Sequence, residues 1–143
     1  MSTREAAESC REPEAHALLE PQAIAFHHQP VVRLDNARTH AYEALMRPIL
    51  DGFGDPLAAF RAAEGAGLAS QLDRACLESA IDALPEVPRG TRLFVNASPT
   101  TLLDGTITAA GLAGKIRAQG GAPESVVIEL TEHAEVTDLE ALA

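Results

Sequence analysis

The sequence has few cysteines, few aromatic residues and few basic residues, and each shortage argues against a class of protein. Two cysteines, Cys10 and Cys76, cannot build a disulfide framework, so we expect reduced thiols and a cytoplasmic setting. Tryptophan is absent and aromatic residues make up 3% of the chain, which favours helix-covered α/β structure over a β-sandwich. Eleven basic residues against 21 acidic ones give a net charge of −10, which opposes binding to a nucleic acid polymer.

Long apolar runs are also missing. None approaches the ~18 residues of a membrane span, and the polar segment 1–14 lacks the apolar core of a signal peptide. A hydrophobic content of 46% over 143 residues is enough for one globular core. We expect a polar N-terminal extension over 1–20, with one or two helical turns over 13–19, and a single domain over 21–143.

One short apolar segment, 41–47, carries both a carboxylate and a guanidinium. Period-2 alternation along a strand puts Glu43, Leu45 and Arg47 on one face. Burying a carboxylate is costly unless it is paired or bound to a metal. This strand therefore predicts a polar pocket with a ligand rather than a packed core.

Two later segments repeat this design. Segment 93–98 carries Asn96 and segment 126–131 carries Glu129, each near the carboxyl end of a mostly apolar strand. Separations of 96 − 43 = 53 and 129 − 96 = 33 residues leave room for helical crossovers between parallel strands. Ligands bind at the carboxyl ends of such strands. Glu43, Asn96 and Glu129 therefore predict a site for a hard divalent cation, Mg²⁺ or Mn²⁺.

The remaining pattern predicts about four strands with helices between them. A hairpin turn at 35–38 makes the first strand antiparallel to the second. Ser70, followed by Asp73, predicts a capping-box variant at a helix start. We expect strands over 24–34, 39–47, 93–98 and 126–131, and helices over 57–64, 70–84 and 106–118.

Four segments, in order and spacing, together resemble the EAL domain family over about residues 23–132. They are Tyr-Glu-Ala-Leu-Met-Arg at 42–47 with 26–32 before it, the alanine–glutamate–glycine–leucine type of helix at 60–68, the asparagine strand at 93–98, and the glutamate strand at 127–132. The tripeptide Glu-Ala-Leu at 43–45 alone would occur often by chance, whereas four segments in the same order are a specific signal.

The resemblance implies a metal-dependent phosphodiesterase that opens the bacterial second messenger cyclic di-GMP to linear pGpG. Carried over by position, Glu43, Asn96 and Glu129 would be the metal ligands. The implied fold is α/β, an incomplete TIM-like (β/α) barrel of the EAL type whose first strand is reversed.

Four further residues acquire roles from the same resemblance. Arg47 would hold a substrate phosphate, Gln29 would lie against the bound dinucleotide, and Leu45 would form part of the pocket wall. Glu132 would be an acid behind the ligands that orients the site.

The later motifs of the family pattern do not appear before Ala143, where the sequence stops. A barrel of eight strand–helix units typically needs ~250 residues, and the family's paired aspartates, lysine and last glutamate come after the glutamate strand. The aspartates would bind a second metal, so we expect this length of chain not to be a competent catalyst. The alternatives are a non-catalytic module that binds cyclic di-GMP or a protein partner, and an inactive remnant. For the remnant, unpaired strand edges and exposed apolar faces predict aggregation or dimerisation. The expected protein partners are a second copy of the chain, in a homodimer, or a signalling domain.

Each site residue also has an ordinary interpretation when taken alone. Glu43 and Arg47 could be an ion pair on a half-exposed strand, and Asn96 could be a turn former at a strand end. Glu129 and Glu132 could be solvated charges before the next helix. The four segments together favour the site.

Overall fold

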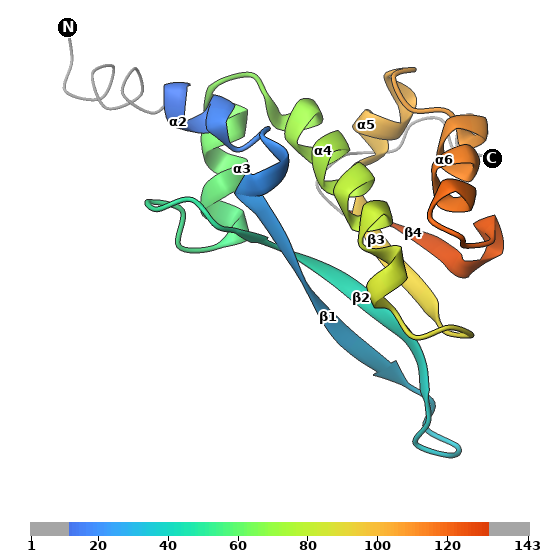
Figure 1. Ribbon diagram of the computed structural model, residues 1–143. Helices are drawn as coiled ribbons and strands as arrows, with labels where there is room; N and C mark the ends of the chain where they lie inside the picture. The colour runs from blue at the N-terminus through green and yellow to red at the C-terminus, as the bar shows by residue number, and fades with distance from the viewer. Residues whose placement is uncertain (1–11, 132–143) are drawn as a thin grey trace, which may run out of the picture.

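A four-stranded sheet forms the centre of the protein in the computed structural model, which describes residues 12–131. The order is β1-β2-β3-β4, with β1 antiparallel to β2 and the other two pairings parallel (Figure 1). This confirms the expected α/β class with four strands and a reversed first strand. The strands are β1 (Ile24–Val32), β2 (Thr39–Pro48), β3 (Arg92–Ala97) and β4 (Val126–Leu130).

Helices precede the sheet and connect its parallel strands. None of those within residues 12–131 is long and apolar enough to cross a lipid bilayer. The α-helices are α2 (Glu12–Ala17), α3 (Pro56–Gly65), α4 (Ala69–Asp82), α5 (Pro99–Leu103) and α6 (Ala109–Ala118), and the 3₁₀ turns are η1 (Pro21–Ala23), η2 (Leu84–Glu86) and η3 (Pro123–Ser125).

Local chemistry at both ends of α3 explains why α3 and α4 are separate helices. Asp55 Oδ1 accepts the Ala58 N–H at 2.8 Å, which caps the start of α3. At its end, Gly67 adopts φ +69° and the Leu68 N–H donates back to the Ala63 carbonyl at 2.7 Å. This left-handed closure needs a glycine and fixes where the chain turns into α4.

The expected capping box of Ser70 and Asp73 is wrong. Helix α4 begins at Ala69 with Leu68 at its N-cap and no side-chain cap bond. The turn that ends α3 places Leu68 directly before α4, so Ser70 already lies inside the helix. Asp73 instead lies on the buried side of α4, 8% exposed.

The expected helix 106–118 is shorter, and a second helix precedes it. Asp104 Oδ1 accepts from both the backbone N–H and the hydroxyl of Thr106, at 2.8 and 2.6 Å, which closes a turn before the helix. Thr108 then caps α6 by accepting the Gly111 N–H at 3.1 Å. The short α5 was not expected from the sequence.

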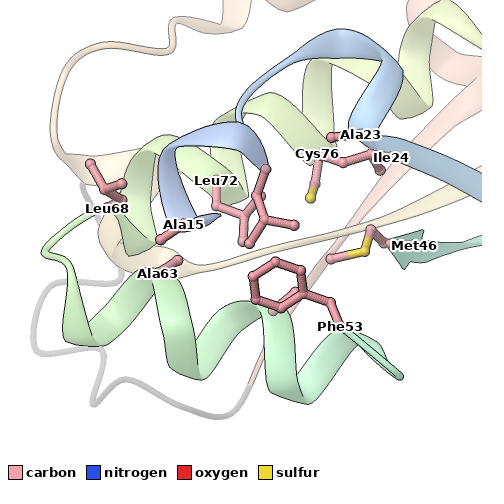
Figure 2. Close-up of a cluster of buried hydrophobic side chains, with 11 residues drawn as sticks. Ala15, Ala23, Ile24, Met46, Phe53, Ala63, Leu68, Leu72 and Cys76 are labelled. Atoms are coloured by element: carbon pink, nitrogen blue, oxygen red, sulfur yellow. The ribbon is translucent and has the colours of Figure 1, made fainter. Parts of the chain in front are cut away.

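One part of the core lies among the first helices and the ends of β1 and β2 (Figure 2). There Leu72 of α4 is fully buried, in one cluster with Met46 and Phe53. Ala15 and Leu18 are also fully buried, although they belong to the expected extension 1–20. The packed domain therefore begins before residue 21, and the polar extension stays a prediction for residues 1–11, which lie outside the described range.

The second part of the core lies between the sheet and helices α4 and α6. Helix residues cover alternate positions of β2 and β3 there. The buried members are Ala44, Leu93, Val95 and Ala97 of the sheet, Leu77, Ala80 and Ile81 of α4, Leu84 and Val87 after it, and Ile116 of α6. Because strand side chains alternate between faces, the residues between them project from the opposite face of the sheet. That opposite face carries the expected site.

Candidate functional site

Glu43 of β2 and Asn96 of β3 meet directly, although 53 residues separate them in the chain. The Asn96 Nδ2 donates a hydrogen bond to Glu43 Oε1 at 3.0 Å. Because the nitrogen is the donor, the Asn96 Oδ1 remains available, as does the second carboxylate oxygen of Glu43. Carboxylate and amide oxygens are the ligands that hard divalent cations take in proteins.

Strand register puts Glu129 of β4 beside this pair. Asn96 is the Cα partner of Glu129, and Glu43 is the partner of Phe94, two residues before Asn96. Partners in a sheet project from the same face, so all three oxygen-bearing side chains share one face of adjacent strands. Each of the three is partly exposed. Their joint binding of a cation stays a prediction.

Among the described residues, no three His, Cys, Asp or Glu side chains gather closely enough to hold a metal ion. The expected ligand set contains two carboxylates and one amide, so it is not a group of that kind. A cation here would depend on the amide oxygen of Asn96.

Leu45 and Arg47 line a cavity of about 680 Å³ at the carboxyl ends of β2 and β3, and Asn96 lines it as well. Phe26 and Phe60 contribute aromatic surface to its wall. Arg47 is half-buried, and its Nη1 donates to the Met46 carbonyl at 2.8 Å. A guanidinium has five N–H donors, so this contact orients Arg47 while leaving donors for an anion.

Gln29 lies on the same sheet face as the expected ligands. It is the antiparallel partner of Glu43 on β1, and its side chain is exposed. It does not line the cavity, so a ligand would have to extend over Glu43 to contact Gln29.

Asp73 is a polar residue of the same cavity that sequence reasoning assigned to a different role. Its Oδ2 accepts the backbone N–H of Ser98 at 2.8 Å, joining α4 to the segment after β3. Burial raises the pKa of this carboxyl, and the Ser98 N–H opposes that shift. The buried Thr101 hydroxyl also favours the ionised form but does not complete a hydrogen bond. The sequence does indicate a buried position for Asp73, because this residue falls among apolar positions such as Leu72 and Cys76.

Cys76 has no nucleophilic character in this environment. Burial, with a smaller contribution from the charge of Asp73, raises the pKa of its thiol to about 12. The thiol is therefore protonated at neutral pH, and a protonated thiol is a poor nucleophile. This agrees with the expectation of a small buried apolar residue on the helix.

Comparison with known families decides which kind of domain carries this geometry. The EAL domain family model matches residues 14–143. The chain belongs to the EAL domain family.

Solved structures share the EAL fold. BlrP1 of Klebsiella pneumoniae, in a calcium and cyclic di-GMP complex, is 28% identical with a TM-score of 0.66, over 79% of this chain and 28% of that one. The FimX EAL domain of Pseudomonas aeruginosa bound to cyclic di-GMP is 29% identical with a TM-score of 0.63, over 82% and 50% of the two chains. The Xanthomonas citri FimX EAL domain has a TM-score of 0.71 at 24% identity, over 88% and 52%, and supports the fold alone.

The chain thus spans about half of the FimX EAL chains and less than a third of the BlrP1 chain. No curated protein matches it. Of the residues expected in the EAL site, Glu132 lies outside the described range, so its orienting role stays a prediction.

Proposed function

We propose that this EAL domain binds cyclic di-GMP at the carboxyl ends of β2, β3 and β4, through a divalent cation held by Glu43, Asn96 and Glu129. The observation that carries the proposal is the Asn96–Glu43 hydrogen bond, because it brings two of the three expected ligands together from separate strands. Family membership supports the ligand, since BlrP1 and FimX are solved with cyclic di-GMP.

The residues present fit a hard cation by their chemistry. Two carboxylates and an amide oxygen suit Mg²⁺, Mn²⁺ or Ca²⁺ better than a softer metal that prefers sulfur or imidazole. A bound cation would supply charge neutralisation to a phosphate and would lower the pKa of a water molecule. The positive charge of the cation matters because a chain with net charge −10 would otherwise repel an anionic dinucleotide.

Three further side chains would hold the dinucleotide. Arg47 is oriented by the Met46 carbonyl and would donate its free N–H groups to a phosphate. Leu45 would give an apolar wall, and Gln29, exposed opposite Glu43, would contact the ligand where it leaves the cavity.

In a protein that also carries the later motifs of the family, the proposed reaction is hydrolysis of one of the two phosphodiesters. Water adds its hydroxyl to phosphorus, the P–O3′ bond breaks, and the O3′ takes up a proton, which gives linear pGpG. Binding without hydrolysis is the second candidate. It is favoured by the fact that Arg47, Leu45 and Gln29 can bind ligand but cannot activate water. A cytoplasmic location, suggested by the sequence, is part of either proposal.

Calorimetry of the full chain with cyclic di-GMP, in Mn²⁺ or in EDTA, tests the proposal. We expect binding in Mn²⁺ that EDTA weakens, and a loss of about tenfold or more in Asn96→Ala and in Arg47→Ala. Arg33→Ala is the matched control, because Arg33 is an exposed arginine at the hairpin tip that pairs with Asp35 at 2.7 Å. Chromatography of the incubated nucleotide distinguishes hydrolysis from binding alone.

Two results would contradict the proposal in different ways. If calorimetry detects no binding heat at high micromolar cyclic di-GMP, the chain does not bind this ligand and the binding role is refuted. Binding of equal strength in EDTA and in Asn96→Ala would leave a dinucleotide site but remove the cation from it.

A further inference from the structure

We propose that Asp73 is a positioning residue for the cation site: by holding the Ser98 N–H, it fixes the end of β3 from which Asn96 reaches Glu43. This inference rests on the proposed function for its consequence, but the hydrogen bonds themselves do not. Asp73 Oδ2 accepts from Ser98 at 2.8 Å, and Asn96 Nδ2 donates to Glu43 at 3.0 Å.

The distance along the chain between these two contacts is short. Asn96 lies two residues before Ser98, and the β3 strand ends between them at Ala97. The Ala97 carbonyl accepts the N–H of Thr131, the residue after β4, at 3.1 Å, so the end of β4 is also tied to this junction. Helix α4 and strand β4 together therefore restrict the backbone immediately after Asn96.

Ser98 also begins the next helix. Its Oγ accepts the Thr100 N–H at 3.2 Å, and its carbonyl accepts the Leu102 N–H at 3.2 Å. The Ser98 N–H points away from these capping contacts to Asp73. Without that acceptor, the junction between β3 and α5 would lose the hydrogen bond that the Asp73 side chain of α4 makes to its backbone.

A carboxylate is a costly choice for this position unless its hydrogen bond is needed. Asp73 is 8% exposed, and burial of a charge without a counter-ion is unfavourable. The ion pairs found among residues 12–131 are Arg33–Asp35 and Lys115–Asp82, and Asp73 takes part in neither. An apolar residue would serve packing at least as well, so the bond to Ser98 is what explains an oxygen acceptor at this position.

The cavity connects this contact to the site. Asp73, Ser98 and Asn96 all line it, together with Arg47. A shift of the junction would therefore move the Asn96 amide and alter the same space that a ligand would enter.

Three variants of the full chain separate positioning from general stability. Asp73→Ala removes the acceptor, whereas Asp73→Asn keeps an oxygen for Ser98 and presents an amide to the unpartnered Thr101 hydroxyl. Cys76→Ala is the matched control, because Cys76 is buried on the same helix one turn later and lines the same cavity. The readouts are Ser98 amide exchange, the side-chain NH₂ resonances of Asn96 without metal, and Mn²⁺ affinity by calorimetry.

We expect Asp73→Ala to expose the Ser98 amide, shift the Asn96 resonances and weaken Mn²⁺ binding by about tenfold or more. Asp73→Asn and Cys76→Ala should leave all three close to wild type. Unchanged Asn96 resonances in Asp73→Ala, or an equal shift in Cys76→Ala, would overturn the inference. If the wild type binds no Mn²⁺, the proposed cation site fails, while the Asn96 resonances still decide whether Asp73 positions that side chain.

Discussion

The contact between Glu43 and Asn96 should be measurable as an interaction energy without any ligand. We would replace each residue by alanine, singly and together, and determine the free energy of unfolding of the four proteins in urea with EDTA present. The difference between the double variant and the sum of the single variants isolates the pair. Any cation effect is removed by the chelator, so the cycle reports the protein's own hydrogen bond.

The structure sets the expected size of this energy. The bond is 3.0 Å long and its acceptor is a carboxylate, and hydrogen bonds to charged groups contribute about 1.5–3 kcal/mol when well buried. Both side chains are only partly buried, so competition from water reduces the expected coupling to about 1 kcal/mol. A coupling below about 0.3 kcal/mol, within the usual error of additivity, would refute the contact. The exposed Arg33–Asp35 pair serves as a control cycle, and we expect no resolvable coupling there.

Three further predictions concern α4. Leu72→Ala should lower the free energy of unfolding by about 3 kcal/mol, because Leu72 is fully buried, whereas Leu34→Ala, at a fully exposed position, should leave the urea midpoint unchanged. Burial raises the pKa of Asp73 above its ordinary value of 3.8, so the folded state holds this proton more tightly than the unfolded state. Relative to Asp73→Asn, the wild type should therefore be most stable below that ordinary value and lose stability as the pH rises through the folded pKa, which urea midpoints across the acid range would show. With Cys10 replaced by serine, Cys76 should react with a thiol reagent at neutral pH only after unfolding, because its pKa of about 12 keeps the thiol protonated; rapid labelling of the native protein would contradict this.

The sheet and its polar face could be predicted because strand alternation carries both kinds of information. Along β3, Leu93 and Val95 face the helices and are buried, while Phe94 and Asn96 face the other way. The same alternation in β2 separates Ala44 from Glu43. Since partner residues share a face, three strand patterns were sufficient to place Glu43, Asn96 and Glu129 on one side of the sheet.

The parts that could not be predicted depend on contacts between distant segments or on competing local bonds. Helix α5 has only five residues, too few for a periodic pattern, and its start depends on the Ser98 cap. The start of α6 depends on Asp104, which closes a turn with Thr106 where the sequence pattern alone allowed a helix. The cavity arises from side chains of strands and helices that meet only in the folded protein.

Asp73 shows how one local pattern permits two structures. A serine followed by an acid three residues later fits a capping box, but it fits equally well an acid one turn into a helix. The apolar positions decide between them: Asp73 lies beside Leu72 and shares its buried side with Cys76, so its carboxylate must find a partner in the interior. Asp82 lies about 180° around the same helix, on its polar side, where an acid is expected to be exposed. Asp82 is exposed, and it pairs with Lys115 at 2.9 Å. An acid on the apolar side of a helix is therefore better interpreted as a tertiary hydrogen-bond acceptor than as a cap.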